Sequence, residues 1–108
     1  MPESYRVVVT PGAQKHLADI RDYICLDLDS PAASKRMLDY LLSQIRSLAA
    51  FPGRVPLDAA MGELGIHKMT VRNYLIYFWI EEQKRTVHVI AVIYGRMDQL
   101  PQILHSLS

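Results

Sequence analysis

The chain has 108 residues, half of them apolar, and a formal net charge of +1 at pH 7. This length suits one domain that buries roughly 65% of the surface its unfolded chain would expose. The near-neutral charge argues against a dedicated nucleic-acid-binding protein, which usually carries a basic stripe. No apolar run approaches the roughly 18 residues of a membrane helix, and the start MPESYR lacks the apolar region of a signal peptide. The single Cys25 cannot form an internal disulfide. We therefore expect a single domain over residues 1–108, located in the cytoplasm and without contact to a membrane.

The first half of the chain predicts a strand followed by a helical hairpin. Tyr5–Val9 is short and β-branched, which is typical of a strand. Thr10 followed by Pro11 combines an N-cap with a proline at the first helical position, and Ser30-Pro31 repeats this signal for a second helix. The second helix is expected to run about 20 residues, to Phe51-Pro52-Gly53, because proline cannot continue it. The short link between the helices predicts an antiparallel pair.

The second half predicts two β-hairpins. Residues 52–65 are rich in turn-forming residues and are expected to form a surface loop. Three strands follow, Ile66–Val71, Tyr74–Glu81 and Thr86–Tyr94, joined by turns at Arg72-Asn73 and residues 82–85. Residues 98–107 can form a short terminal helix. The fold class is α+β, in the order β-α-α-β-β-β-(α), with the helical hairpin on one face of a small, mostly antiparallel sheet.

The hairpin turns fix a register and divide the strand residues between two faces. The face expected to pack against the helices carries Met69, Val71, Tyr74, Ile76, Phe78, Ile80, Val87, Val89, Ala91 and Ile93. The opposite face is expected to carry Lys68, Thr70, Leu75, Tyr77, Trp79, His88, Ile90, Val92 and Tyr94. Soluble monomers rarely expose an apolar patch as large as this second set would form. We therefore expect the C-terminal segment or another polypeptide to cover it.

Three stretches carry a similarity to a known family: TPGAQKHLADIRDYI, PAASKRMLDYLLSQIRSLAAFPGR and NYLIYFWIEEQKRTVHVIAVIYGRMDQLPQIL. Over residues 5–104 the chain thereby resembles the RelE/ParE toxins of bacterial type II toxin–antitoxin systems. The resemblance implies the β-α-α-β-β-β layout and a protein antitoxin whose C-terminal segment wraps and inactivates the toxin, with higher-order toxin–antitoxin hetero-oligomers as a further expectation. It also implies a role in plasmid stabilization.

Two mechanisms occur in the family that the chain resembles. RelE-like members are mRNA interferases that cleave mRNA on the ribosome with basic residues of the open sheet face and an arginine near the end of the last strand. ParE-like members are DNA gyrase inhibitors without that set. Leu75 stands where a RelE-like enzyme has an arginine, whereas Arg96 lies close to the position of the terminal arginine. The resemblance slightly favours the gyrase inhibitor, with the ribosome-dependent endoribonuclease and an inert antitoxin-binding co-repressor as alternatives.

If the chain is an RNase, it is a metal-independent one, because 2′-hydroxyl attack needs only an acid, a base and cations at the phosphate. The candidate catalytic residues are Arg96, Tyr94, His88 and Lys68. The candidate antitoxin- or target-binding residues are Leu75, Tyr77, Trp79, Ile90, Val92 and Arg72. The competing interpretations are a packed, inert His88 beside Trp79 and solvated charges at Lys68 and Arg72. The four histidines lack the spacing of metal ligands, so neither a metal nor a cofactor is expected.

Overall fold

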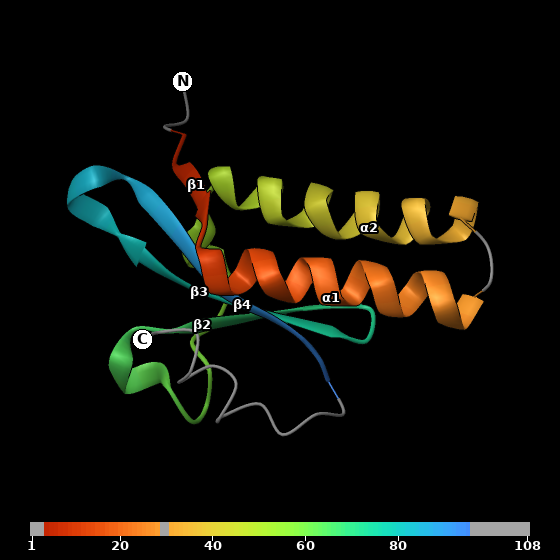
Figure 1. Ribbon diagram of the computed structural model, residues 1–108. Helices are drawn as coiled ribbons and strands as arrows, with labels where there is room; N and C mark the ends of the chain where they lie inside the picture. The colour runs from red at the N-terminus through yellow and green to blue at the C-terminus, as the bar shows by residue number, and fades with distance from the viewer. Residues whose placement is uncertain (1–3, 29–30, 96–108) are drawn as a thin grey trace.

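Helices and strands form two layers in the computed structural model (Figure 1). The structure describes residues 4–28 and 31–95 of the chain. In the first helix it describes the side chains only as far as Tyr23. The described elements are β1 (Arg6–Val9), α1 (Pro11–Leu28), α2 (Pro31–Arg46), β2 (His67–Val71), β3 (Tyr74–Glu81) and β4 (Thr86–Tyr94). Their order and α+β class are those predicted. The terminal helix predicted over residues 98–107 lies outside the described residues. Within the part described, no helix has the length and apolar character needed to cross a membrane.

Both helices begin at the predicted prolines, but α2 ends earlier than expected. The Thr10 side-chain oxygen accepts a hydrogen bond from the Ala13 amide at 3.3 Å, so Thr10 caps α1 as its position suggested. Helix α2 ends at Arg46 and continues into a 3-10 turn over Ser47–Ala49. The Tyr5 amide donates to the Ala49 carbonyl at 2.8 Å. This contact holds the chain beside β1, which favours a tighter turn over a straight continuation of the helix.

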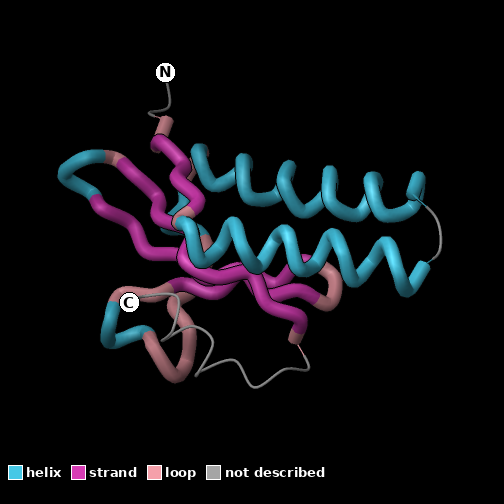
Figure 2. Tube along the Cα trace, viewed as in Figure 1, coloured by secondary structure: helices cyan, strands magenta, loops and turns pink. Residues whose placement is uncertain are grey.

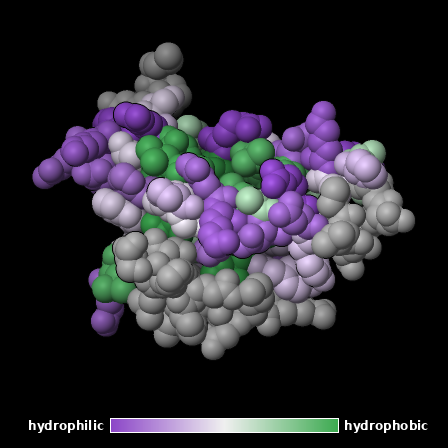
Figure 3. Space-filling view, viewed as in Figure 1, coloured by the Kyte–Doolittle hydropathy of each residue, from purple (hydrophilic) through white to green (hydrophobic). Residues whose placement is uncertain are grey.

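The four strands form one sheet in the order β1-β4-β3-β2. Strand β1 pairs with β4 in parallel, and the other two pairs are antiparallel. Both helices lie on one side of this sheet (Figures 1 and 2). The segment between α2 and β2 packs Leu48 and Val55 in the core with the helices and then passes to the other side, where Met61 lies. The two-residue turn at Arg72-Asn73 and the four-residue turn after Glu81 are as predicted. Figure 3 shows that the tip of the β3–β4 hairpin is hydrophilic.

The main core lies between the sheet and the helices. Buried helix residues Ala13, Ile20, Leu41 and Ile45 pack there in one cluster with buried strand residues such as Ile76, Phe78, Val87 and Val89. We call this side of the sheet the helix-side face and the opposite side the outer face. The predicted faces are correct throughout β2 and β3 and along β4 as far as Ile90.

A β-bulge in β4 overturns the predicted faces of its last four residues. Phe78 pairs with Val89 but Tyr77 pairs with Ala91, so Ile90 is an extra residue without a partner on β3. Beyond Ile90 every side chain therefore points to the face opposite to the predicted one. Ala91 and Ile93 belong to the outer cluster, and Val92 and Tyr94 pack with the helix-side core.

The segment predicted as a surface loop, residues 52–65, is partly built into the fold. Leu57 forms an isolated bridge with His67, and the Asp58 amide donates to the Ile66 carbonyl at 2.8 Å. Met61 and Ile66 are buried against the outer face of the sheet. This segment of the same chain therefore contributes to the cover that the outer face was expected to need.

Candidate functional site

The outer face gathers most of the residues that the sequence singled out. Its cluster contains buried Tyr77 and Ile90, which are 1% and 2% exposed, together with partly exposed Leu75 and Trp79. His88 pairs with Trp79 across the strands and lies on the same face. Of the predicted binding residues on this face, Leu75 and Trp79 therefore present accessible surface, whereas Tyr77 and Ile90 form its interior.

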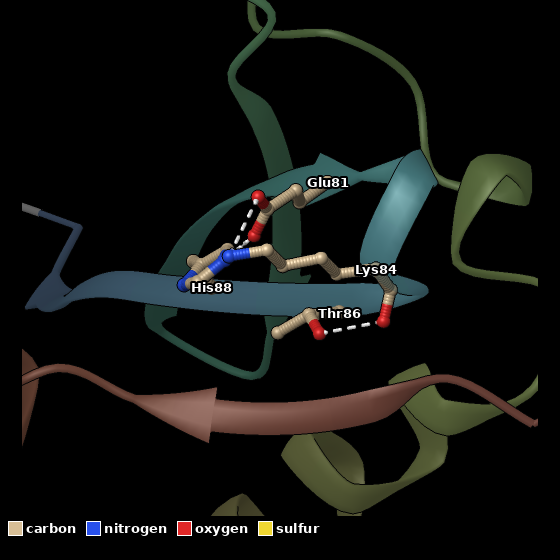
Figure 4. A network of polar contacts seen from close by, with 4 residues as sticks. All are labelled: Glu81, Lys84, Thr86 and His88. Atoms are coloured by element: carbon tan, nitrogen blue, oxygen red, sulfur yellow. Dashed lines mark hydrogen bonds and ion pairs between the residues drawn. The ribbon is translucent and has the colours of Figure 1, made fainter.

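His88 is held by a ring on one side and a carboxylate on the other. Its imidazole stacks on Trp79 with a centroid distance of 4.3 Å and an interplanar angle of 12°. Its Nε2 lies 2.9 Å from Oε1 of Glu81. Lys84 Nζ lies 3.9 Å from the other oxygen of the same carboxylate, so Glu81 faces two basic groups (Figure 4). This arrangement fixes the orientation of the imidazole and places a negative charge directly beside it.

Lys68 is also paired with a carboxylate. Its Nζ lies 3.4 Å from Oδ1 of Asp58, a residue that is only 6% exposed. The other oxygen of Asp58 accepts hydrogen bonds from the amides of Ala60 and Met61 at 2.9 and 2.8 Å. The three donors together compensate a buried negative charge.

The neighbouring Tyr77 stays protonated at neutral pH. Burial, followed by the negative charge of Asp58, raises the pKa of its phenol to about 12. A group with this pKa is a poor general base near pH 7. Tyr77 is therefore suited to packing under the outer face and not to proton abstraction.

Of the remaining predicted site residues, Tyr94, Val92 and Arg72 do not lie with His88. Because of the bulge, Tyr94 lies on the helix-side face, where its ring meets Tyr74 edge-on at 5.6 Å. Val92 lies there too, and its amide donates to Nδ1 of His16 at 3.2 Å. The Arg72 guanidinium carbon lies 4.6 Å from the centre of the Tyr40 ring on α2. Arg96 lies outside the described residues.

Sequence reasoning missed the two carboxylates that organise this face, Asp58 and Glu81. The register alone points to Glu81, which pairs with Thr86 and is therefore a diagonal neighbour of His88. Asp58 precedes Ala59-Ala60, a position where an Asp side chain often accepts the amides of a turn. Its contact with Lys68 depends on how the segment before β2 folds back, which local pattern does not reveal.

The described side chains of this face are suited to proton exchange and to binding. In residues 4–28 and 31–95, no group of three or more His, Cys, Asp or Glu side chains could hold a metal ion. His88 with Glu81 forms an acid–base pair, but Glu81 and Asp58 place negative charge beside His88 and Lys68, two of the basic groups that could bind a phosphate. The partly exposed Leu75 and Trp79 instead offer an apolar surface of the kind that protein partners use.

Comparison with known proteins decides which family this arrangement belongs to. The family model of the ParE toxin of type II toxin–antitoxin systems, parDE, matches residues 7–99. The chain belongs to the ParE toxin family. This confirms the resemblance to the RelE/ParE toxins that the sequence carries.

Solved structures of toxin–antitoxin systems share the fold of this ParE-family chain. A chain of the RelBE2 complex from Mycobacterium tuberculosis superposes with a TM-score of 0.61 at 23% identity, covering 84% of this chain and 91% of its own. A chain of the chromosomal ParDE system from P. aeruginosa reaches a TM-score of 0.71 at 12% identity, covering 85% and 97%. At these identities the likeness shows the fold alone. A search among curated protein sequences found no significant match.

Proposed function

We propose that this ParE-family toxin arrests growth by binding its target, DNA gyrase, without cleaving RNA, and that a cognate antitoxin neutralises it. The family match is to the ParE model. The gyrase target follows from the resemblance of the sequence to ParE-like toxins, and the antitoxin is the partner that the RelBE2 and ParDE systems contain.

The observation that carries the non-catalytic mechanism is the pairing of His88 and Lys68, the candidate catalytic bases described on the outer face, with the carboxylates of Glu81 and Asp58. A phosphate that approached His88 would meet the charge of Glu81, and one that approached Lys68 would meet that of Asp58. Like charges at about 4 Å repel by about 4 kcal/mol at an effective dielectric constant of 20. Cleavage of RNA needs the opposite arrangement, with cations directed at the phosphate.

Two further features support binding over RNA cleavage. Leu75, at the position where the resemblance expects the arginine of an RNase, lies in the apolar cluster of the outer face. Tyr94 lies on the helix-side face, so a candidate proton donor is separated from His88 by the sheet.

The test is a direct comparison of two activities of the purified full chain. We expect it to inhibit the supercoiling of relaxed plasmid by gyrase and to leave ribosome-bound mRNA intact. Induction of the chain without its proposed antitoxin should arrest growth and produce a DNA damage response with linearised plasmid.

Two results would contradict the proposal. Transcripts cut within codons, together with loss of toxicity in Arg96→Ala, would support the ribosome-dependent RNase. Absence of growth arrest on induction of a folded, soluble chain would leave only a module that binds the antitoxin.

A further inference from the structure

A second feature, away from the outer face, is a cavity of about 380 Å³ between α1 and the ends of β3 and β4. From α1 it is lined by Asp19, Ile20 and Tyr23, spaced so that they share one stripe of the helix. From the sheet it is lined by Tyr74, Val92 and Tyr94. Its volume lies within the range of sites that hold a small ligand or a single inserted side chain.

The bulge in β4 places aromatic side chains in the lining of this cavity. Because Ile90 is the extra residue, Val92 and Tyr94 face the helices, and the Tyr94 ring meets Tyr74 edge-on with an interplanar angle of 65°. Tyr23, which is 62% exposed, adds a third aromatic ring from α1. The faces of aromatic rings carry partial negative charge and attract cations within about 6 Å.

The charge of the cavity is also suited to a cation. Asp19 is a carboxylate among its lining residues, and none of the described lining residues is a lysine or an arginine. Nδ1 of His16 accepts the Val92 amide, so this imidazole is neutral in the observed arrangement. Lys15 Nζ lies 3.8 Å from Asp19, but both side chains are largely exposed, and such pairs contribute little to stability. A cation from a partner can therefore replace Lys15.

We propose that this cavity binds a lysine or arginine side chain of the antitoxin, an inference that depends on the proposed function. The apolar stem of such a side chain matches the walls formed by Ile20 and Val92, and its charged end matches Asp19 and the tyrosine rings. A purely apolar side chain would remove water from Asp19 without pairing it, which is unfavourable. An acidic side chain would be repelled.

The first test probes the chemistry of the cavity with small molecules. The full chain, labelled with ¹⁵N, is titrated with n-butylammonium or n-butylguanidinium, and with n-butanol or valerate as uncharged and anionic controls. We expect the two cations to shift the amide signals of Val92 and Tyr94, and the controls to leave them unchanged. Equal shifts from butanol or valerate, or none from the cations, would overturn the proposal.

Single substitutions on α1 and β4 identify the groups that bind the cation. We expect Asp19→Asn to weaken binding of n-butylammonium about fivefold and Tyr94→Leu about threefold, in line with exposed ion-pair and cation–π interactions. Asp22→Asn is the control, because Asp22 is an exposed carboxylate on α1 paired with Arg21 and does not line the cavity. Unchanged affinity in Asp19→Asn, or an equal loss in Asp22→Asn, would overturn the assignment of the carboxylate.

The second test asks whether the antitoxin supplies the cation. The proposed antitoxin, sought as the product of a small gene beside that of the toxin, is bound to the wild-type chain, to Asp19→Asn and to Asp22→Asn. We expect Asp19→Asn to lose at least fivefold in affinity while its toxicity is unchanged. If Asp19→Asn binds the antitoxin like the wild type, the antitoxin does not occupy the cavity. A chain that fails to arrest growth would overturn the proposed function instead, and the titration with small cations would remain informative.

Discussion

Lys68 Nζ lies 3.4 Å from Oδ1 of Asp58, so a strand residue on the outer face is tied to a buried carboxylate in the segment before that strand. The same carboxylate accepts the amides of Ala60 and Met61. Asp58 thereby fixes the turn that brings Met61 against the sheet. The pairing has a structural role, and it holds the partly exposed Lys68 against Asp58.

The first prediction concerns the stability contributed by Asp58. Replacement of Asp58 by Ala leaves the amides of Ala60 and Met61 without their acceptor, so we expect the free energy of unfolding to fall by about 2–3 kcal/mol. The measurement is urea denaturation followed by the fluorescence of Trp79. Lys68→Met is the control and should cost clearly less than Asp58→Ala, because the amides keep their acceptor and Lys68 is partly exposed. Equal costs for the two variants would show that the ion pair, and not the turn, is the stabilising element.

The second prediction concerns alkaline pH. The folded pKa of Tyr77 is raised to about 12, whereas an unfolded tyrosine ionises near pH 10. Between these values the folded chain holds a proton that the unfolded chain has lost. Stability is therefore unaffected by this group below pH 10 and falls as the pH rises toward 12, by about 2–3 kcal/mol in total.

Tyr77→Phe isolates this contribution, because it cannot ionise and keeps the buried ring. Denaturation of both proteins in steps from pH 8 to pH 11.5 should give a steeper loss for the wild type. Parallel curves would mean that Tyr77 is ionised in the folded state as readily as in the unfolded state.

The third prediction tests whether His88 takes part in toxicity. His88→Phe keeps a ring to stack on Trp79 but removes proton exchange and the bond to Glu81. If the toxin acts by binding, growth arrest should be retained after induction without the antitoxin. Lys68→Met should behave in the same way. A folded His88→Phe chain, verified by its Trp79 emission, that no longer arrests growth would favour the RNase.

The sequence predicts the order of elements because each signal is local. Thr10 and Pro11 define the start of α1, and the turn at Arg72-Asn73 sets the register of β2 with β3. These interactions join residues close in sequence, so their physical causes are visible in the pattern. The family resemblance added the antitoxin but no geometry for the site.

The faces of the β4 side chains beyond Ile90 could not be predicted, because residues 89–93 are all apolar. Without an alternation of apolar and polar residues, the sequence does not indicate which side chains face the helices. The prediction that His88 lies on the face opposite to the helices was correct, but the register set by the turn after Glu81 holds only for the part of β4 before the bulge. Asp58 was missed for a related reason. Its burial depends on the contact of its amide with the Ile66 carbonyl, which only the folded segment creates.

The last prediction follows from the bulge itself. In the observed register Val89 faces the helices, Ala91 faces outward and Val92 faces the helices again, so removal of Ile90 would restore regular alternation without turning over any other residue. We therefore expect a chain lacking Ile90 to fold, with a loss of about 3 kcal/mol from the missing buried side chain. Ile90→Ala is the matched control, since it loses most of the same side chain and keeps the extra residue. Urea denaturation should place the two variants within about 1 kcal/mol of each other. If Ile90→Ala folds and the deletion does not, the twist that the bulge gives to β4 is itself required for the packing of Val92 and Tyr94 against the helices.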